Sequence, residues 1–147
     1  MQRYNVCEID LAAIRHNVGV MKSHIAGGAK FLAVVKADAY GHGAVPVAKA
    51  ALEAGADMLA VAIPEEGIEL RNAGIAAPIL VLGGIEESAA EAVVQYNLTQ
   101  VVFDESRIRA LAQAGRKLGQ NAQVHLKLDT GMNRIGVRTE AEAQALT

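Results

Sequence analysis

Lys36 stands where an apolar run ends and a glycine-containing turn begins, in the stretch FLAVVKADAYGHG at residues 31–43. Burying an ammonium group without a partner is costly, so a lysine at this place either reaches water or has a chemical task. An amine that is partly dehydrated and close to other cations attacks carbonyl groups and can form a Schiff base. Lys36 is therefore a candidate nucleophile. A solvated lysine before an ordinary turn fits the spacing equally well.

The residues that follow this lysine suit a phosphate group. Tyr40 offers a phenol, His42 an imidazole, and Gly41 and Gly43 a flexible backbone that leads into a helix. Backbone amides at the start of a helix bind phosphate readily. The stretch is not a Walker loop, because its lysine precedes the glycines and no Gly-Lys-Ser/Thr follows. We predict that Tyr40 and the turn over residues 41–43 hold a phosphate.

A second group of candidates lies in HLKLDTGMNRIG, residues 125–136. Lys127 and Asp129 are two residues apart, so on a strand they would share one face, and a plain salt bridge would explain the pair. Arg134 follows a glycine-containing turn, and its rigid fork of donors suits a carboxylate or a phenolate. DTG also occurs in aspartic proteases, but those need two such aspartates in a β-rich fold, so we discard that match.

A third stretch, LVLGG at residues 80–84, is predicted to be a buried strand with a glycine turn. Leu82 or Gly83 could at most line the wall of a pocket there.

The elements that must position these residues alternate along the chain. Short apolar runs rich in valine, isoleucine and leucine predict strands at 31–35, 58–62, 79–82, 99–103 and 124–128. Helices are predicted at 10–26, 43–55, 64–74, 86–96 and 104–119, and a further one begins in TEAEAQALT. Asp10 and Asp104 are the expected N-caps, Pro64 the expected first helical residue, and Gly119 the expected stop.

This alternation predicts an α/β fold with parallel strands joined by right-handed crossovers. Two architectures fit: an open doubly wound sheet, or the first five units of a (β/α)8 TIM-type barrel. A complete barrel needs about 250 residues, so a chain of 147 residues would be a fragment of one. In both architectures the functional side chains lie at the carboxyl ends of the strands.

Composition narrows the classes of function. The chain has 14 basic and 16 acidic side chains and few aromatic ones, which argues against nucleic acid as the main partner. Cys7 is the single cysteine and cannot form an internal disulfide, so we expect a reducing, cytoplasmic location. No secretory signal and no membrane span are expected. The four histidines show no metal-ligand spacing, so no metal site is predicted.

Taken together, AVVKADAYGHG and HLKLDTGMNRIGV resemble the bacterial alanine racemases, enzymes of fold type III that use pyridoxal 5'-phosphate (PLP). The resemblance runs from EIDLAAIRHN to Val137, nearly the whole chain. It implies that residues 1–147 are the N-terminal portion of a PLP-binding (β/α)8 barrel domain. A mostly β C-terminal domain, absent from this chain, would complete a head-to-tail homodimer.

The resemblance also implies roles for individual residues. Lys36 matches the lysine that forms the aldimine with PLP and acts as a catalytic base, and Tyr40 matches the tyrosine that contacts the phosphate. Arg134 matches the arginine that contacts the phenolic oxygen of the cofactor and orients the substrate carboxylate. Lys127 matches a lysine that is often carbamylated and then holds that arginine. Asp38 departs from the family, which usually has asparagine there.

The implied function is the interconversion of L-alanine and D-alanine, which supplies D-alanine for cell-wall peptidoglycan. The second base implied by the resemblance is a tyrosine of the partner's C-terminal domain, so the isolated 147-residue chain is expected to be inactive. Two alternatives are a single-domain PLP-binding homeostasis protein of the same fold type and a non-catalytic phosphate-binding α/β module.

Overall fold

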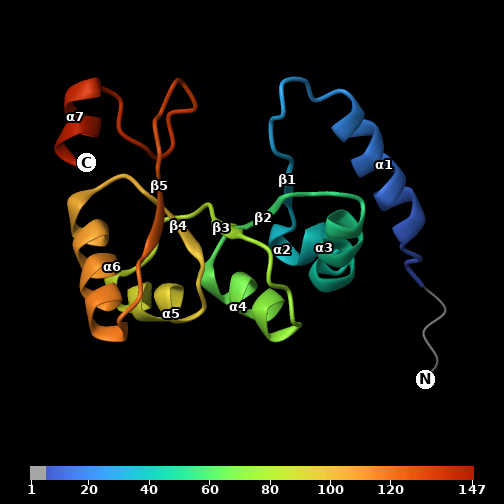
Figure 1. Ribbon diagram of the computed structural model, residues 1–147, viewed down its shortest axis with the longest axis horizontal. Coiled ribbons are helices and arrows are strands. Elements are labelled where there is room, and N and C mark those ends of the chain that lie inside the picture. Colours follow the sequence, from blue (N-terminus) through green and yellow to red (C-terminus); the bar gives the residue numbers. More distant parts are fainter. Residues whose placement is uncertain (1–5) are drawn as a thin grey trace.

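Five short parallel strands form one sheet whose spatial order follows the chain, β1-β2-β3-β4-β5 (Figure 1). The computed structural model describes residues 6–147. The strands are β1 (Leu32–Val34), β2 (Met58–Val61), β3 (Ile79–Val81), β4 (Thr99–Val102) and β5 (Gln123–Leu126). A doubly wound sheet reverses its strand order at a switch point, whereas a barrel adds each strand beside the last. The sequential order therefore favours the barrel over the doubly wound sheet.

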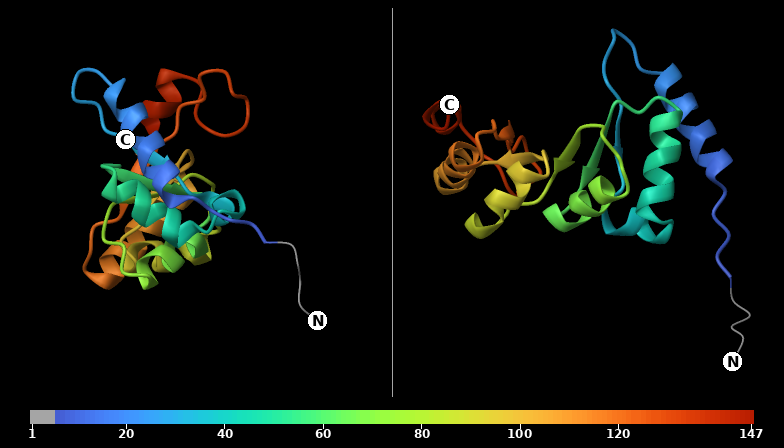
Figure 2. Two further views of the ribbon diagram at one scale, coloured as in Figure 1. Left: turned by 90° about the vertical axis from the view of Figure 1, so that its right-hand side faces the viewer. Right: turned by 60° about the horizontal axis from the view of Figure 1, so that its bottom comes forward.

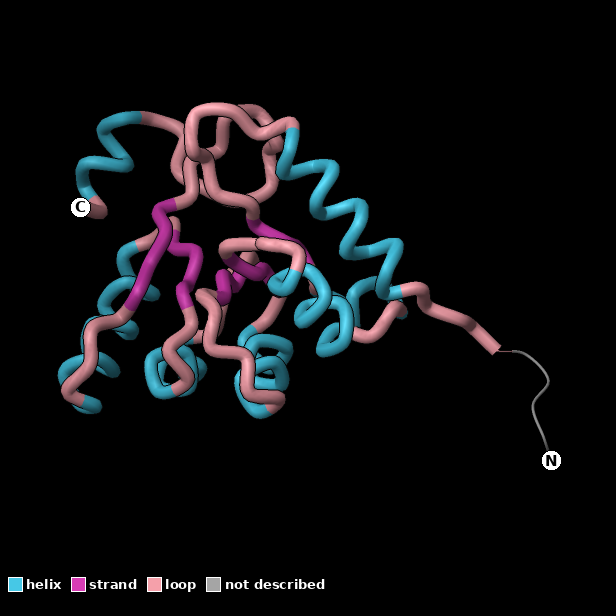
Figure 3. Tube along the Cα trace, turned by 45° about the vertical axis from the view of Figure 1, so that its right-hand side comes forward, coloured by secondary structure: helices cyan, strands magenta, loops and turns pink. Residues whose placement is uncertain are grey.

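Helices follow the strands and lie on one side of the sheet (Figures 1 and 3). They are α3 (Ala44–Glu53), α4 (Pro64–Asn72), α5 (Ala90–Gln95), preceded by the 3-10 turn η1 (Glu87–Ala89), and α6 (Glu105–Leu118). An N-terminal helix, α1 (Leu11–Ser23), runs beside α3 (Figure 2), and a short helix, α7 (Glu140–Ala145), ends the chain. Every strand and helix expected from the sequence is present, with ends that differ by a few residues.

The two faces of the sheet have different partners. Alternate strand residues such as Leu59, Val61 and Ile79 pack with the helices in the main core. The residues between them, such as Ala60 and Leu80, form a separate cluster built from the strands and the residues directly after them. Such a face, buried by strand side chains and not by helices, is the interior of a (β/α) barrel.

The capping signals in the sequence are confirmed. Asp10 Oδ1 accepts hydrogen bonds from the amides of Ala12 and Ala13, and Asp104 accepts one from the amide of Arg107. Pro64 is the first residue of α4. Gly119 ends α6 in the left-handed conformation, with φ of 65°. Each side-chain cap of this kind is worth about 1 kcal/mol to its helix.

Three predicted elements differ in detail. The helix expected at 10–26 ends at Ser23. Met21, expected on its apolar stripe, is exposed, and Val18 is the residue of α1 that packs into a core, mainly against α3. The helix expected at 86–96 begins as the 3-10 turn η1, in which the amide of Ala89 bonds to the carbonyl of Glu86. β5 ends at Leu126, before Lys127. Over residues 6–147, no helix has the length and apolar character needed to span a bilayer.

Candidate active site

Lys36 and Arg134, which are far apart in the sequence, line the same cavity of ≈ 270 Å³. Lys36 follows β1, Ala62 follows β2, and Leu82 to Gly84 follow β3, so the cavity lies at the carboxyl edge of the sheet. Its lining includes two cations and no acidic side chain. Such a cavity suits an anionic ligand that also carries a group reactive toward an amine. The expectation that candidate residues gather at the carboxyl edge is therefore met for Lys36 and Arg134.

A larger cavity of ≈ 550 Å³ lies between α6 and the start of β5. It is lined mainly by apolar and small residues and contains none of the candidate residues. A site is defined by the chemistry that converges on it as well as by its volume. We therefore place the candidate site at the smaller cavity.

The edge strand β1 ends two residues before Lys36. Val35, directly before it, is 1% exposed, whereas Lys36 is half-buried and its Nζ lies 6.0 Å from the centre of the Tyr40 ring. Among the described residues, no carboxylate or carbonyl accepts a hydrogen bond from this amine. An amine that borders a cavity without an acidic partner is available for covalent chemistry.

The turn after Lys36 is left-handed. Four consecutive residues, Ala37 to Tyr40, have φ between 51° and 53° and ψ between 41° and 50°. L-residues pay roughly 1–2 kcal/mol each for this conformation, and none of the four is glycine. The turn, α2 (Lys36–Gly41), was expected as a flexible glycine turn and is instead a strained helical one. Other contacts must therefore hold it in place.

The far end of α2 is held by Asp38. Its Oδ1 accepts a 2.6 Å hydrogen bond from the amide of Ala44, the first residue of α3, and its carbonyl accepts from the amide of Gly43. An asparagine at this position would also offer an oxygen to Ala44. The departure from the family's usual asparagine therefore keeps the acceptor and adds a negative charge.

The expectation that amides of residues 41–43 are free for a phosphate is wrong for two of them. The amide of His42 donates to the carbonyl of Ala39, and that of Gly43 donates to the carbonyl of Asp38. Tyr40 is 69% exposed and lies outside the lining of the cavity, so its phenol is accessible. Of this turn, the structure leaves the phenol as the candidate phosphate contact.

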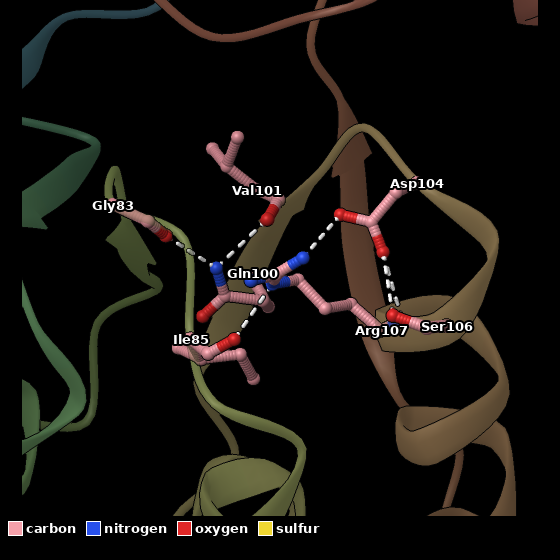
Figure 4. A network of polar contacts seen from close by, with 7 residues as sticks. All are labelled: Gly83, Ile85, Gln100, Val101, Asp104, Ser106 and Arg107. Atoms are coloured by element: carbon pink, nitrogen blue, oxygen red, sulfur yellow. Dashed lines mark hydrogen bonds and ion pairs between the residues drawn. The ribbon is translucent and has the colours of Figure 1, made fainter.

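Glycine is required in the wall of the cavity. A Cβ on Gly83 would meet the carbonyl oxygen of Ala62 at 2.5 Å, so the backbone after β3 passes too close to β2 for any side chain. The buried Gln100 of β4 holds this backbone by donating to the carbonyl of Gly83 at 2.7 Å (Figure 4). Leu82, Gly83 and Gly84 all line the cavity, as the sequence allowed for the first two.

Arg107 holds Ile85, the residue directly after this wall (Figure 4). Its Nε donates to the carbonyl of Ile85 at 2.6 Å, and its Nη1 pairs with Asp104 Oδ2 at 2.6 Å. Burial raises the pKa of Asp104, but hydrogen bonds from Arg107 and Ser106 outweigh it and lower that pKa below its ordinary value. The ion pair with a charged Asp104 therefore holds Arg107 in place, and Arg107 in turn holds the carbonyl of Ile85.

The loop that carries Arg134 is organised by Asp129. Its Oδ1 accepts hydrogen bonds from the amides of Asn133, at 2.9 Å, and Gly131, at 3.1 Å, and these lower its pKa. Arg138 Nε lies 3.5 Å from Oδ2. The DTG triplet therefore shapes a loop that brings Arg134 to the cavity.

The side chain of Lys127 contacts the backbone. It lies beyond β5, and its Nζ donates to the carbonyl of Leu128 at 2.7 Å. Among the described residues it forms no ion pair with Asp129 and no hydrogen bond with Arg134. The salt bridge considered for Lys127 and Asp129 is therefore wrong: Lys127 Nζ donates to a backbone carbonyl, and Asp129 pairs with Arg138.

Sequence reasoning missed three residues that support the site: Glu66, Gln100 and Arg107. Gln100 had a visible signal, a polar residue inside the apolar run TQVVF. Glu66 accepts hydrogen bonds from the amides of Ala37 and Ala62, and its contact with Ala37 joins separate βα units, so the sequence carried no signal for it. Arg107 had no signal, because its contact with Ile85 joins separate βα units.

Residues 9–147 match the family model described as "Alanine racemase, N-terminal domain". The chain belongs to this family. It is 54% identical to an alanine racemase of Symbiobacterium thermophilum over 131 residues, 89% of this chain and 34% of that protein. It is 49% identical to alanine racemase 2 of Oceanobacillus iheyensis, over 92% of this chain and 35% of that protein. The chain spans about a third of the length of these curated relatives.

Solved alanine racemases share the fold. That of Clostridium difficile 630 superposes with a TM-score of 0.90 at 40% identity, covering 97% of this chain and 38% of that one. That of Bacillus anthracis, solved with bound L-Ala-P, superposes with a TM-score of 0.85 at 40% identity. The superposition covers 94% of this chain and 36% of that one. The resemblance to alanine racemases and the partial barrel predicted from the sequence are both confirmed.

Proposed function

We propose that the protein containing this chain is a PLP-dependent alanine racemase, an isomerase that interconverts L-alanine and D-alanine for cell-wall peptidoglycan. The observation that carries the proposal is the convergence of Lys36 and Arg134 on one cavity at the carboxyl edge of the sheet. Membership of the alanine racemase N-terminal domain family supports the same reaction.

The residues at the cavity fit PLP. The cofactor carries an aldehyde, a phenolic oxygen and a phosphate. Lys36 and Arg134 in the cavity lining offer an amine and a guanidinium. Tyr40, outside the lining but with its ring centre 6.0 Å from Lys36 Nζ, offers a phenol. Gly83 adds no side chain to the lining of the cavity, because a Cβ there would collide with the carbonyl of Ala62. When bound, PLP supplies an electron-withdrawing ring that makes the α-proton of an attached amino acid removable.

The chain's own residues have separate roles in binding and in proton transfer. Lys36 Nζ would hold the cofactor and would accept or return the proton at the substrate α-carbon on its own side. Arg134 orients the substrate carboxylate and contacts the phenolic oxygen, and Tyr40 binds the phosphate. Lys127 is carbamylated and then holds Arg134, as the resemblance implies. A single base returns the proton to the face that it left, so inversion needs a second proton-carrying group on the opposite face.

The organisation of the protein follows from the same proposal. Residues 1–147 form the N-terminal portion of the PLP-binding barrel domain. A C-terminal β domain outside these residues supplies the second base across a homodimer. The supporting observation is that the chain covers 34% and 35% of two relatives that are named alanine racemases. The proposed location is the cytoplasm.

The test uses the full gene product. After incubation with PLP and reduction with borohydride, peptide mass spectrometry should find the cofactor attached to Lys36. The same preparation should form D-alanine from L-alanine. A label at Lys36 without racemisation would favour the PLP homeostasis protein, and no label would refute both PLP-dependent functions.

A further inference from the structure

The carboxylate of Glu66 joins the ends of β1 and β2. Its Oε1 accepts a hydrogen bond of 2.6 Å from the amide of Ala37, and its Oε2 accepts one of 2.6 Å from the amide of Ala62. Ala37 directly follows Lys36, and Ala62 lines the cavity. We propose that Glu66 is a positioning residue for Lys36, which holds the first residue of the left-handed turn. This proposal rests on the proposed function of Lys36.

The left-handed turn explains why such a contact is needed. Ala37 has φ of 52°, a conformation that alanine avoids when nothing enforces it. Asp38 holds the far end of the turn through Ala44. Within residues 6–147, Glu66 is the one side chain that accepts a hydrogen bond from the near end, beside Lys36. If Ala37 returned to a right-handed conformation, the chain would leave Lys36 in a different direction.

The contact needs both oxygens of a carboxylate. Two amides from different strand ends face Glu66 from two sides, and the amide of Ile63 adds a third donor at 3.3 Å from Oε2. Glutamine can keep the bond at the helix start with its one oxygen, as in ordinary capping boxes. Its NH₂ group would then face the Ala37 amide, donor against donor. Glu66→Gln therefore removes the Ala37 bond selectively.

The neighbouring Glu65 provides a matched control. It lies in the same first turn of α4, carries the same charge, is exposed, and forms no hydrogen bond or ion pair among the described residues. Glu65→Gln thus changes the net charge and the charge at the start of α4 by the same amount as Glu66→Gln does. Any difference between the two variants reports the contacts of Glu66.

The experiment compares wild type, Glu66→Gln and Glu65→Gln as full gene products. The dissociation constant for PLP and the rate of borohydride-stable labelling at Lys36 are measured for each. Loss of a charge-assisted hydrogen bond is expected to weaken PLP binding about tenfold and to slow labelling about tenfold in Glu66→Gln. Glu65→Gln should stay within about twofold of wild type. Equal behaviour of the two variants would overturn the proposal.

A rescue variant separates positioning from a general structural role. Glycine adopts the left-handed conformation without a Cβ penalty, and Ala37 is exposed, so Ala37→Gly removes little packing. The double variant Ala37→Gly/Glu66→Gln should recover PLP affinity to within about threefold of wild type. Failure of glycine to rescue, whether in binding or in folding, would place the role of Glu66 in α4 and overturn the proposal.

The two proposals fail in different ways. If wild-type protein takes no label at Lys36, the proposed function fails, and the positioning role fails with it. If wild type is labelled and Glu66→Gln behaves like Glu65→Gln, only the positioning role fails.

Discussion

The side-chain amide of Gln100 donates a 2.7 Å hydrogen bond to the carbonyl of Gly83, and this bond joins a buried residue of β4 to the wall of the cavity. The same Nε2 also donates to the carbonyl of Val101, whereas Oε1 has no partner. Both hydrogen bonds that Gln100 donates therefore go to backbone carbonyls, and one of these, that of Gly83, borders the cavity.

Gln100→Leu should lower the free energy of unfolding by about 1 kcal/mol. The substitution leaves the Gly83 carbonyl without its donor, and the removal of the unpartnered Oε1 offsets part of that cost. Chemical denaturation measures the change, with Gln123→Leu on the exposed edge strand β5 as the control. Equal effects of the two substitutions would contradict a supporting role for Gln100.

Lys36→Ala should abolish the borohydride-stable PLP label and reduce racemisation by at least 100-fold. The amine is both the point of attachment and a positioned base, and loss of such a group costs on the order of 100- to 10,000-fold. Lys49→Ala, at an exposed position of α3, is the control and should keep label and rate. A label that persists in Lys36→Ala would exclude Lys36 from this role.

Tyr40→Phe should weaken PLP binding by about 1 kcal/mol, since the substitution removes one hydrogen bond to a charged phosphate and leaves the ring. Titration with PLP measures the dissociation constant. Tyr96→Phe removes a phenol at the C-cap of α5, away from the cavity, and should have no effect. Unchanged affinity in Tyr40→Phe would count against a phosphate contact.

Asp129 should make the Arg134 loop sensitive to acid. Hydrogen bonds from the amides of Asn133 and Gly131 lower its pKa below the ordinary 3.8. A lowered pKa in the folded state means that the carboxylate stabilises the fold above pH 3.8 and that this contribution is lost as pH falls through the folded value.

The variant Asp129→Asn keeps the acceptor oxygen and removes the charge. Wild type should be more stable than Asp129→Asn at pH 7, and the difference should shrink to nothing once pH falls below the lowered pKa. Thermal melting from pH 7 to pH 2 measures both proteins. A difference that is independent of pH would show that the charge of Asp129 does not contribute.

The isolated 147-residue chain should be nearly inactive and prone to aggregate. Both β1 and β5 are edge strands. Val34 in β1 is 46% exposed, and Val124 in β5 is 45% exposed. Unpaired apolar edges favour association with other chains. D-alanine formation by residues 1–147 with PLP, compared with the full gene product, measures the activity, and turnover within tenfold would refute this prediction.

Local features of the sequence determined the elements and the candidate lysine. Apolar runs, the N-caps Asp10 and Asp104 and the stop at Gly119 act over a few residues, so the strands and helices that they predict are found. The place of Lys36, just after the apolar run that forms β1, follows from the same local pattern.

Tertiary structure alone decided how these elements are used. The choice between a doubly wound sheet and a barrel depends on which distant strands pair, and the order β1 to β5 settles it. The local preferences of Ala37, Ala39 and Tyr40 do not predict a left-handed turn, because this conformation is unfavourable for such residues in an isolated chain. That turn exists because carboxylates in the folded protein hold both of its ends: Asp38 reaches Ala44, and Glu66 reaches Ala37 from another βα unit.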